Sequence, residues 1–476
     1  MKRLLGILLL SSSLAACVSA PSTTPHETAL KSGSLGLVAT ETPEISDAWW
    51  KAFGDPQLDS LVEQALKGSP TLAAASARLR AAQSELAAST AATYPQITAD
   101  GNEMRERFSK NYIIPPPYGG TTQWIGTVQA NLSYSLDLFG KEQDQIDRAG
   151  AAAKAAGLDA TAARLLLAGS VTQAYIALSR AYVLRDVAQE AVKQRQEIFT
   201  LTRGRVRAGL DTTASEKQAE ALLAMAREDL VRADANRDLA IHQIAALIGR
   251  GADAYTVARP ELNDAALALP DTLPADLLAR RADIAAAQAR IDAAYSGREV
   301  ARKAFYPDIN LLAAAGWAAI GLGPMFSASA LQYGGGAAIH LPIFDAGKLR
   351  ADYAGATADL DQSVADYNRT VVDAIRQAAD GITELRAVQE QARQQHIALS
   401  AAQASFDLST RRYRSGLNPL QNALDSEAAL IQARRQYAAL SADTASARVS
   451  LLMALGGGFD SKKAILTNTS QDTSHE

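Results

Sequence analysis

The side chains that could carry out chemistry in this 476-residue chain do not gather into a catalytic or metal-binding pattern. The stretch Asp345–Lys348 lacks the glycine spacing of a phosphate-binding loop, and Gly321–Gly323 lacks the third glycine of a dinucleotide site. The five histidines are scattered along the chain without the spacing of metal ligands: His26, His242, His340, His396 and His475. We therefore predict that the protein is not an enzyme and holds no metal or cofactor.

The one cysteine of the chain, Cys17, follows a basic start and a short apolar run at Leu4–Leu10. That run is too short to span a bilayer and is typical of a secretion signal. The residues Leu14–Cys17 resemble the lipobox of bacterial lipoproteins, in which the cysteine sulfur receives a diacylglycerol. We predict a signal peptide over 1–16 and lipid attachment at Cys17; a chance cysteine in an ordinary signal peptide is the alternative. The next residue, Val18, differs from the Asp that marks inner-membrane retention in many lipoproteins, which favours the outer membrane.

The composition favours long helices and argues against a nucleic-acid partner. The net charge is −4 and basic residues form no blocks. Apolar residues make up 48% of the chain but aromatic residues only 6%, and much of the apolar share is alanine, the best helix former. The polar segment 17–45 is predicted to be a lipidated tether and 456–476 a polar tail. After the signal, the sequence contains no stretch of about 20 apolar residues, so we predict no transmembrane helix.

A six-residue pattern occurs twice, as RVRAGL at Arg205–Leu210 and as RYRSGL at Arg412–Leu417. A Gly-Lys pair, at Gly140 and Gly347, and a helix end, at Gly249 and Gly456, recur at the same offset as this pattern, and a Tyr-Pro pair also recurs in each half of the chain. Self-similarity of this kind indicates an internal duplication. We predict two structural repeats, 46–258 and 259–455.

Two tracts without proline, Lys141–Arg207 and Lys348–Arg414, predict very long helices. Each has about 67 residues, which gives roughly 100 Å of helix at 1.5 Å per residue. Apolar residues recur in the first tract at steps of three and four, typical of a helix-packing seam: Leu167, Val171, Ala174, Leu178, Ala181, Leu184, Ala188 and Ala191. Helices of this length suit a tube or a stalk.

The two Gly-Leu patterns predict the tips of antiparallel helical hairpins, at 205–213 and 412–419. Gly209 and Gly416 suit the left-handed residue that ends a helix. Arginines precede both glycines in the last helical turns, Arg205 and Arg412 among them, where cations favour the helix dipole. The return helices are expected to begin with capping-box spacing from Thr213 to Glu216, and with Asn418 as cap and Pro419 as first helical residue.

The leucines that follow these glycines, Leu210 and Leu417, have two possible roles. Each can pack back on its own helix, as hydrophobic residues often do in this type of helix end. Each can instead be exposed for a partner. The local sequence does not decide between them.

Four segments predict β-strands, at about 96–110, 121–139, 307–319 and 331–344. Apolar and polar residues alternate clearly at Gln123–Phe139 and again at Leu331–Phe344. The third segment is a plausible partner strand rich in Ala and Gly, and the pattern is weaker in the first segment. This alternation is typical of transmembrane barrels, although a half-buried strand in a soluble protein shares it. Four strands cannot close a barrel, so membrane strands here would require several chains to share one barrel.

Several motifs together resemble the outer-membrane efflux factors, the family of the TolC-type exit ducts, and most of all its NodT-type lipoprotein branch. They are the two Gly-Leu tips, LDLFGK, WWKAFGDPQLDSLVEQAL at Trp49–Leu66, LLARRADIAAAQARI at Leu277–Ile291 and LPIFDAGKLRA at Leu341–Ala351. The resemblance covers nearly the whole chain. Two departures, Ala282 where the family has proline and Ser69 where it has asparagine, concern helix starts.

The resemblance implies a mainly α protein with a small β part. Three chains would form one 12-stranded outer-membrane β-barrel and a periplasmic α-barrel of long antiparallel coiled coils. The tips, with Leu210 and Leu417 exposed, would meet a periplasmic adaptor protein that also binds an inner-membrane resistance-nodulation-division pump. Asp425 falls on an acidic position that lines the periplasmic constriction in relatives, while a second such position is Asn422 here.

The function implied is passive export of small molecules such as drugs across the outer membrane. A type I secretion duct for proteins is the alternative within the same class. A poreless periplasmic coiled-coil lipoprotein is the alternative from another class.

Overall fold

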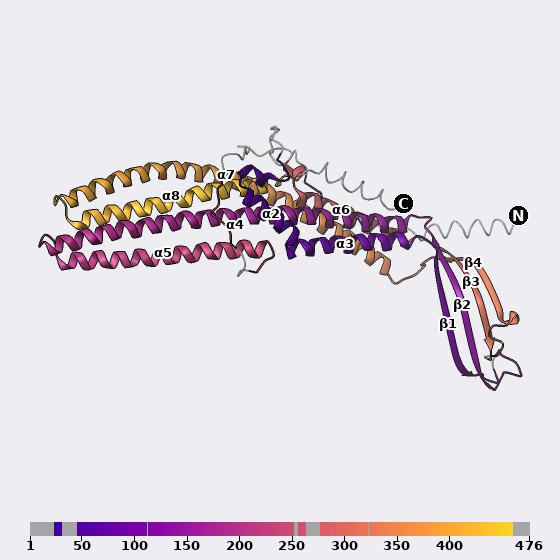
Figure 1. Ribbon diagram of the computed structural model, residues 1–476. Helices are drawn as coiled ribbons and strands as arrows, with labels where there is room; N and C mark the ends of the chain where they lie inside the picture. The colour runs from indigo at the N-terminus through magenta and orange to yellow at the C-terminus, as the bar shows by residue number, and fades with distance from the viewer. Residues whose placement is uncertain are drawn as a thin grey trace. The chain divides into compact units, whose positions relative to one another are not determined.

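The computed structural model describes residues 23–30, 45–111, 113–251, 256–262, 277–321 and 323–459. The predicted signal peptide and Cys17 lie outside these residues, as do parts of the segments 17–45 and 456–476. The described part is mostly helical and contains one four-stranded sheet (Figure 1). Its elements are η2 (Trp49–Phe53), α2 (Pro56–Gly68), α3 (Pro70–Ala91), β1 (Gln96–Arg107), β2 (Thr122–Leu136), α4 (Lys141–Arg207), α5 (Thr213–Leu247), η5 (Leu277–Arg280), α6 (Ala282–Lys303), β3 (Asp308–Ile320), η6 (Ala328–Ala330), β4 (Leu331–His340), α7 (Lys348–Arg414) and α8 (Leu420–Ala454).

The bounds of the long helices agree with the sequence prediction, and those of the strands do so in part. Helices α4 and α7 span the two tracts without proline from end to end. Strand β2 ends at Leu136 rather than 139, because Asp137 caps α4 by accepting from the Gln143 amide at 2.9 Å. Strand β4 ends at His340 rather than 344, and Asp345 likewise caps the start of α7. Strand β1 ends at Arg107, where a loop begins, rather than 110.

The four strands form one antiparallel sheet in the order β1-β2-β3-β4. The register pairs Leu132 of β2 with Ile97 of β1 and Ala313 of β3, so the apolar positions of neighbouring strands share one face. The other face carries polar side chains, among them Asn131, which donates to Asp100 at 2.6 Å. This arrangement confirms the predicted alternation and leaves the apolar face exposed. Its exposed large residues include Ile97, Trp124, Leu311, Trp317, Leu331, Tyr333 and Ile339.

The first strand carries the weakest apolar face of the four. Glu103 and Arg105 occupy the same face as Ile97, but they lie toward the end of β1 that joins the β1–β2 loop. The guanidinium of Arg105 lies 5.9 Å from the ring centroid of Trp124, its partner in the register. The change from apolar to charged residues along one face explains why this strand is harder to recognise from the sequence.

The described chain divides into two compact units that each draw on both halves of the sequence. The first unit contains the sheet with the adjoining parts of α3, α4, α6 and α7. The second contains α2, α5, α8 and the remaining parts of those four helices. Helices α4 and α7 have 67 residues each, α5 and α8 have 35 each, and α3 and α6 have 22 each. These equal lengths accord with the predicted duplication, which remains an inference from the sequence.

The core of the second unit explains the aromatic opening motif of the sequence. Trp49, Trp50 and Phe53 of η2 are buried in one cluster with α2, α4, α5 and α8. The seam predicted on α4 lies in this unit, and all its members except Leu184 are buried. The hydroxyl of Tyr175 donates at 2.6 Å to Asp55, the N-cap residue of α2. The opening motif therefore stabilises the fold.

The segment predicted to be a tether is bound to helices where the structure describes it. In the first unit, the amides of His26 and Glu27 both donate to one carboxylate oxygen of Asp361 on α7, at 2.8 and 3.0 Å. Arg298 of α6 donates to the Thr23 carbonyl at 2.8 Å. The predicted tail also starts later than 456, because the chain stays packed as far as Phe459, which is buried.

None of the helices in the described part of the chain combines the length and the apolar character needed to cross a bilayer.

Candidate functional site

The ends of α4 and α7 have the geometry that the repeated Gly-Leu pattern predicts. Gly209 has φ +70° and Gly416 has φ +74°, both in the left-handed region. The Gly209 amide donates to the Val206 carbonyl at 3.0 Å, and the Leu210 amide donates to the Arg205 carbonyl at 2.9 Å. This pair of bonds is the Schellman motif, and the second tip repeats it with the same spacing. Both patterns therefore end one helix and start the return helix of a hairpin.

Each return helix begins one residue away from the predicted position, α5 one residue earlier and α8 one residue later. The N-cap of α5 is Thr212 rather than Thr213, and its hydroxyl accepts from the Ser215 amide at 3.2 Å. Pro419 is the N-cap of α8 rather than its first helical residue. Asn418 is not the cap, and no side chain caps this end by a hydrogen bond. The tips keep the predicted turns, but the start of each return helix shifts along the chain.

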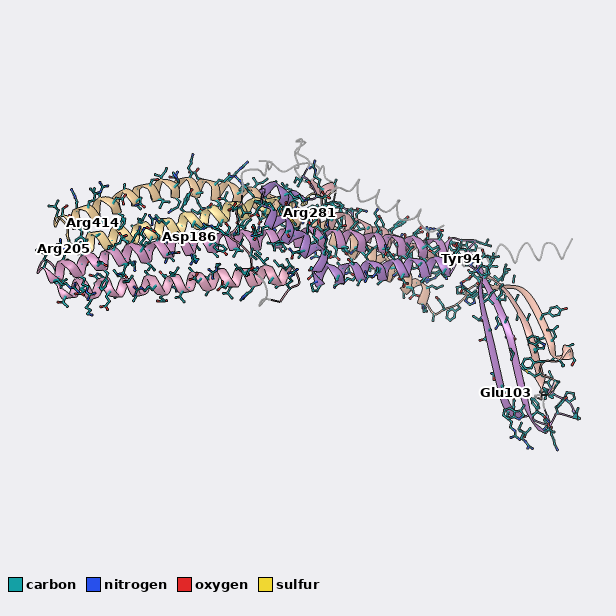
Figure 2. The ribbon with its side chains drawn as sticks, in the orientation of Figure 1. Tyr94, Glu103, Asp186, Arg205, Arg281 and Arg414 are labelled. Atoms are coloured by element: carbon teal, nitrogen blue, oxygen red, sulfur yellow. The ribbon has the colours of Figure 1, made fainter. Side chains whose placement is uncertain are left out.

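The two tip leucines are exposed. Leu210 is 66% exposed and Leu417 is 75% exposed, so neither packs back on its own helix. Leu210 and the last turns of α4 line an open groove of about 630 Å³, to which Gly204, Ala208 and Arg414 of α7 also contribute. Figure 2 places Arg205 and Arg414 at the ends of the two hairpins. The tips thus offer apolar side chains beside a groove.

A buried tyrosine joins the two hairpins just behind their tips. Tyr413 of α7 is 1% exposed, and its hydroxyl donates to the carboxylate of Asp211 at 3.0 Å. The same hydroxyl lies 3.0 Å from the Thr202 hydroxyl of α4. Burial of Asp211 opposes its ionisation, but hydrogen bonds from Ser215, Thr212 and Tyr413 outweigh burial and hold its pKa below the ordinary value.

Arg205 takes part in this junction rather than facing solvent freely. Its guanidinium lies 4.9 Å from the ring centroid of Tyr413 and 3.6 Å from Asp211. Arg412 occupies the same place in the second tip and is exposed. The two arginines that the sequence treats alike are therefore not equivalent. Tyr413, Asp211 and Thr202 were missed in the sequence because no local pattern marks contacts between residues so far apart along the chain.

The acidic residue predicted at the gate lies on the exposed surface of α8 near the second tip. Asp425 accepts a hydrogen bond from Gln421 of its own helix at 2.7 Å. Gln421 in turn accepts from Gln218 of α5 at 3.3 Å, so Asp425 borders the line where the two hairpins meet. Among the residues that the structure describes, no group of three or more His, Cys, Asp and Glu side chains is arranged to hold a metal ion.

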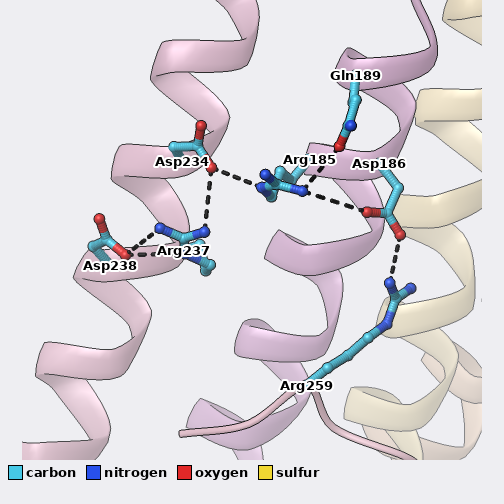
Figure 3. A network of polar contacts seen from close by, with 7 residues as sticks. All are labelled: Arg185, Asp186, Gln189, Asp234, Arg237, Asp238 and Arg259. Atoms are coloured by element: carbon cyan, nitrogen blue, oxygen red, sulfur yellow. Dashed lines mark hydrogen bonds and ion pairs between the residues drawn. The ribbon is translucent and has the colours of Figure 1, made fainter. Parts of the chain in front are cut away.

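Farther from the tip, charged side chains tie α4 to α5 (Figure 3). Arg185 of α4 donates to Asp234 of α5 at 2.7 Å, and Arg237 of α5 bonds to the same carboxylate at 3.2 Å. Asp186 of α4 accepts from Arg259, in the segment after α5, at 2.6 Å. Each partly exposed pair contributes about 0.2–1 kcal/mol, so the network fixes the pairing of the hairpin more than it stabilises the fold.

Comparison with known proteins identifies the family to which this chain belongs. Residues 61–250 and 273–457 match the family described as Outer membrane efflux protein. The chain belongs to the outer membrane efflux protein family. This is a transport family, and its members act in the outer membrane.

Three relatives show how far the likeness to other efflux proteins extends. The fusaric acid resistance protein FusA of Burkholderia cepacia is 36% identical over 366 residues, which cover 74% of this chain and 69% of that protein. The pyoverdine export outer membrane protein OpmQ of Pseudomonas aeruginosa is 30% identical over 463 residues, 94% of this chain and 96% of that protein. The crystal structure of the outer membrane protein VceC of Vibrio cholerae is 32% identical with a TM-score of 0.81, covering 87% of this chain and all of that one.

Proposed function

We propose that this outer membrane efflux protein is the exit duct of a tripartite efflux system and works as a homotrimer. The observation that carries this proposal is the sheet, which has an exposed apolar face and two outer edges, on β1 and β4, without a partner strand in the described chain. Lipid cannot satisfy the backbone groups of such edges. Barrels formed by one chain begin at about 8 strands, so copies of this chain must share one barrel.

Three copies give 12 strands, and the resemblance to TolC-type ducts favours three. Two copies would give 8, so the mass of the detergent-extracted complex distinguishes the two assemblies. In the trimer, the long hairpins of each protomer would line a periplasmic α-barrel. Negative-stain electron microscopy then tests for a lumen: a hollow three-fold particle supports the duct, and a solid rod supports a poreless coiled-coil lipoprotein.

The hairpin tips are the proposed contact with a periplasmic adaptor protein, which would link the duct to an inner-membrane resistance-nodulation-division pump. The exposed Leu210 and Leu417 support this assignment, because an exposed leucine held on a fixed turn is suited to a hydrophobic socket. The proposed contact set is Arg205, Gly209, Leu210, Arg412, Gly416 and Leu417. Arg205 would act there by holding the turn, since its guanidinium already contacts Asp211 and Tyr413.

The proposed gate lies where the hairpins converge. A ring of three Asp425 carboxylates, one from each protomer, would attract cations and repel anions at the constriction. Asn422, one turn earlier on α8, adds no charge to this ring. Opening requires the two hairpins of a protomer to move apart, which would break the contact of Tyr413 with Asp211.

Acylation of Cys17 is proposed as a second attachment to the outer membrane besides the barrel. Acyl chains contribute about 0.8 kcal/mol for each buried CH₂ group, so several chains would hold the N-terminus firmly. Cys17→Ser is then expected to abolish labelling by radioactive palmitate. Labelling that persists in this variant would contradict lipid attachment at Cys17, because the chain has no other cysteine.

The proposed cargo is a class of small organic molecules, in keeping with the fusaric acid and pyoverdine named for two relatives. The direct test is expression, with a cognate adaptor and pump, in a Gram-negative host that lacks its own exit ducts. Restored growth in the presence of fusaric acid supports export. A Leu210→Asp, Leu417→Asp double variant that forms trimers but restores no growth would assign the tips to adaptor contact. Full growth of that variant would reject the tip assignment.

A further inference from the structure

One carboxylate lies in the apolar seam by which α8 packs near the tips. Glu427 is 0% exposed and falls at helical spacing among buried apolar residues of the same helix. Those residues belong to a cluster with Ile198 of α4 and Phe406 of α7. The members of the seam from α8 are Leu420, Ala423, Leu424 and Leu430. A charged group at this position is costly, because burial removes the water that would solvate the carboxylate.

The surroundings of Glu427 compensate its charge only in part. The Nε atom of Arg195 on α4 lies 3.6 Å from the nearer carboxylate oxygen, too far for a hydrogen bond. Within the described part of the chain, both carboxylate oxygens and Arg195 Nε are buried without a hydrogen-bond partner. Arg195 Nη1 instead donates to the Leu222 carbonyl of α5 at 2.8 Å. Glu427 therefore faces one cation whose best hydrogen bond goes elsewhere.

The other charged groups at this level of the hairpins point to other partners. Arg227 of α5 donates to Gln196, and Asp407 of α7 accepts from Gln403. Arg434, on α8 itself, also donates to Gln403. Among the residues that the structure describes, Arg195 is the one charge that bears on Glu427. Burial outweighs its attraction and raises the pKa of the Glu427 carboxyl to about 7.

We propose that Glu427 is a proton-operated latch between the two hairpins of each protomer. With its proton, the side chain is neutral and remains in the seam, and α8 packs against α4 and α5. When the proton leaves to bulk water, the remaining carboxylate is stabilised by hydration. Water can reach it only if the hairpins separate locally. The link to gating rests on the proposed function, because the seam lies next to the tips that would have to part when the duct opens.

The direction of the pH effect follows from which state binds the proton more tightly. The packed state keeps the proton up to about pH 7, whereas an exposed glutamate releases it near its ordinary value of 4.5. Between these values the separated state loses a proton and the packed state does not, so packing weakens as pH rises. Mild acid in the periplasm would therefore tighten the resting hairpins, and neutral or alkaline pH would loosen them.

Hydrogen exchange of the intact detergent-solubilised protein measures this packing without any transport. After correction for the intrinsic exchange rate, the protection of α8 amides around Glu427 is expected to fall roughly 100-fold between pH 5 and pH 8. Glu427→Gln, which keeps the shape of the protonated side chain, is expected to hold the pH 5 protection throughout. Glu228→Gln, the same substitution on an exposed part of α5, is the control and should behave as the unaltered protein.

A second variant keeps the proposal testable if Glu427→Gln does not fold. Arg195→Gln removes the cation and raises the packed-state pKa of Glu427 further, so the fall in protection should extend to higher pH and become larger. Protection that does not change with pH, or that changes equally in Glu427→Gln, would overturn the latch. If the exchange of α8 does not depend on pH, the latch is rejected and the duct proposal still stands. If the unaltered protein shows the pH-dependent exchange but supports no export, only the duct proposal is rejected.

Discussion

The hydroxyl of Tyr413 and the carboxylate of Asp211 meet at 3.0 Å although they are 202 residues apart in the chain. Tyr413 belongs to the last turn of α7 and Asp211 to the turn between α4 and α5, so this one bond spans the two hairpins. Thr202, 3.0 Å from the same hydroxyl, is fully buried. The junction therefore couples any separation of the tips to the loss of buried hydrogen bonds.

Tyr413→Phe is expected to loosen the tips while keeping the packing of the ring. The change removes the hydroxyl that serves both Asp211 and Thr202, which lowers the free energy holding the hairpins together by about 1–2 kcal/mol. If the chain forms the proposed duct, we expect the variant in planar bilayers to spend a several-fold larger fraction of time in the conducting state. Tyr437→Phe is the matched control, because it removes the same hydroxyl from a partly exposed tyrosine of α8. The ring of Tyr437 lies against His396. Equal open fractions in both variants would show that this bond does not hold the gate.

Asp211 should make the junction sensitive to strong acid only. Its pKa is lowered from the ordinary 3.8, since hydrogen bonds to its carboxylate outweigh the effect of burial. A group with a lowered folded-state pKa contributes stability that is present above 3.8 and lost as pH falls through its folded-state value. Asp211→Asn should therefore lower the melting temperature at pH 5–8, and this effect should shrink as pH falls from 3.8 through the folded-state pKa. A destabilisation that stays unchanged in acid strong enough to protonate the folded-state carboxyl would contradict this account.

Gly209 and Gly416 should not tolerate a β-branched residue. Both have positive φ, and no heavy atom lies within 4 Å of an added Cβ, so strain in the backbone alone decides the outcome. Gly209→Val or Gly416→Val is expected to cost about 1–3 kcal/mol locally and to reshape the turn, which impairs export while trimers still form. Gly355→Ala, a helical glycine with open space, should instead be neutral or stabilise by up to about 1 kcal/mol. Normal drug tolerance in both valine variants would argue against the tip assignment.

The sequence predicts the long helices well because their end signals are local. A glycine with positive φ lies directly before α4 and another directly before α7, and a Gly-Leu turn follows each of these two helices. The start of a return helix is less certain, since Thr212 and Thr213 are both competent caps and only the backbone selects one. The exposure of Leu210 and Leu417 likewise depends on what the folded turn leaves uncovered.

The polar contacts of the candidate site could not be predicted in the same way. Tyr413 with Asp211, and Glu427 with Arg195, join helices whose mutual register no local pattern encodes. Glu427 gives a partial signal, because it continues the spacing of buried residues on α8. In an alanine-rich helix, however, a single glutamate on such a stripe is usually a solvated surface residue.

The two faces of the sheet should respond oppositely to the same new charge. Ala130 and Gln129 are neighbours near the middle of β2, so their side chains point to the apolar and the polar face respectively. Ala130→Arg is expected to destabilise the membrane-inserted protein by about 2–4 kcal/mol, because it places a cation in the hydrocarbon layer. Gln129→Arg should have little effect, since its side chain would face water and lie beside Asp100 in the register. Urea unfolding of the two variants in lipid vesicles measures the difference, and equal stabilities would contradict a lipid-facing apolar surface.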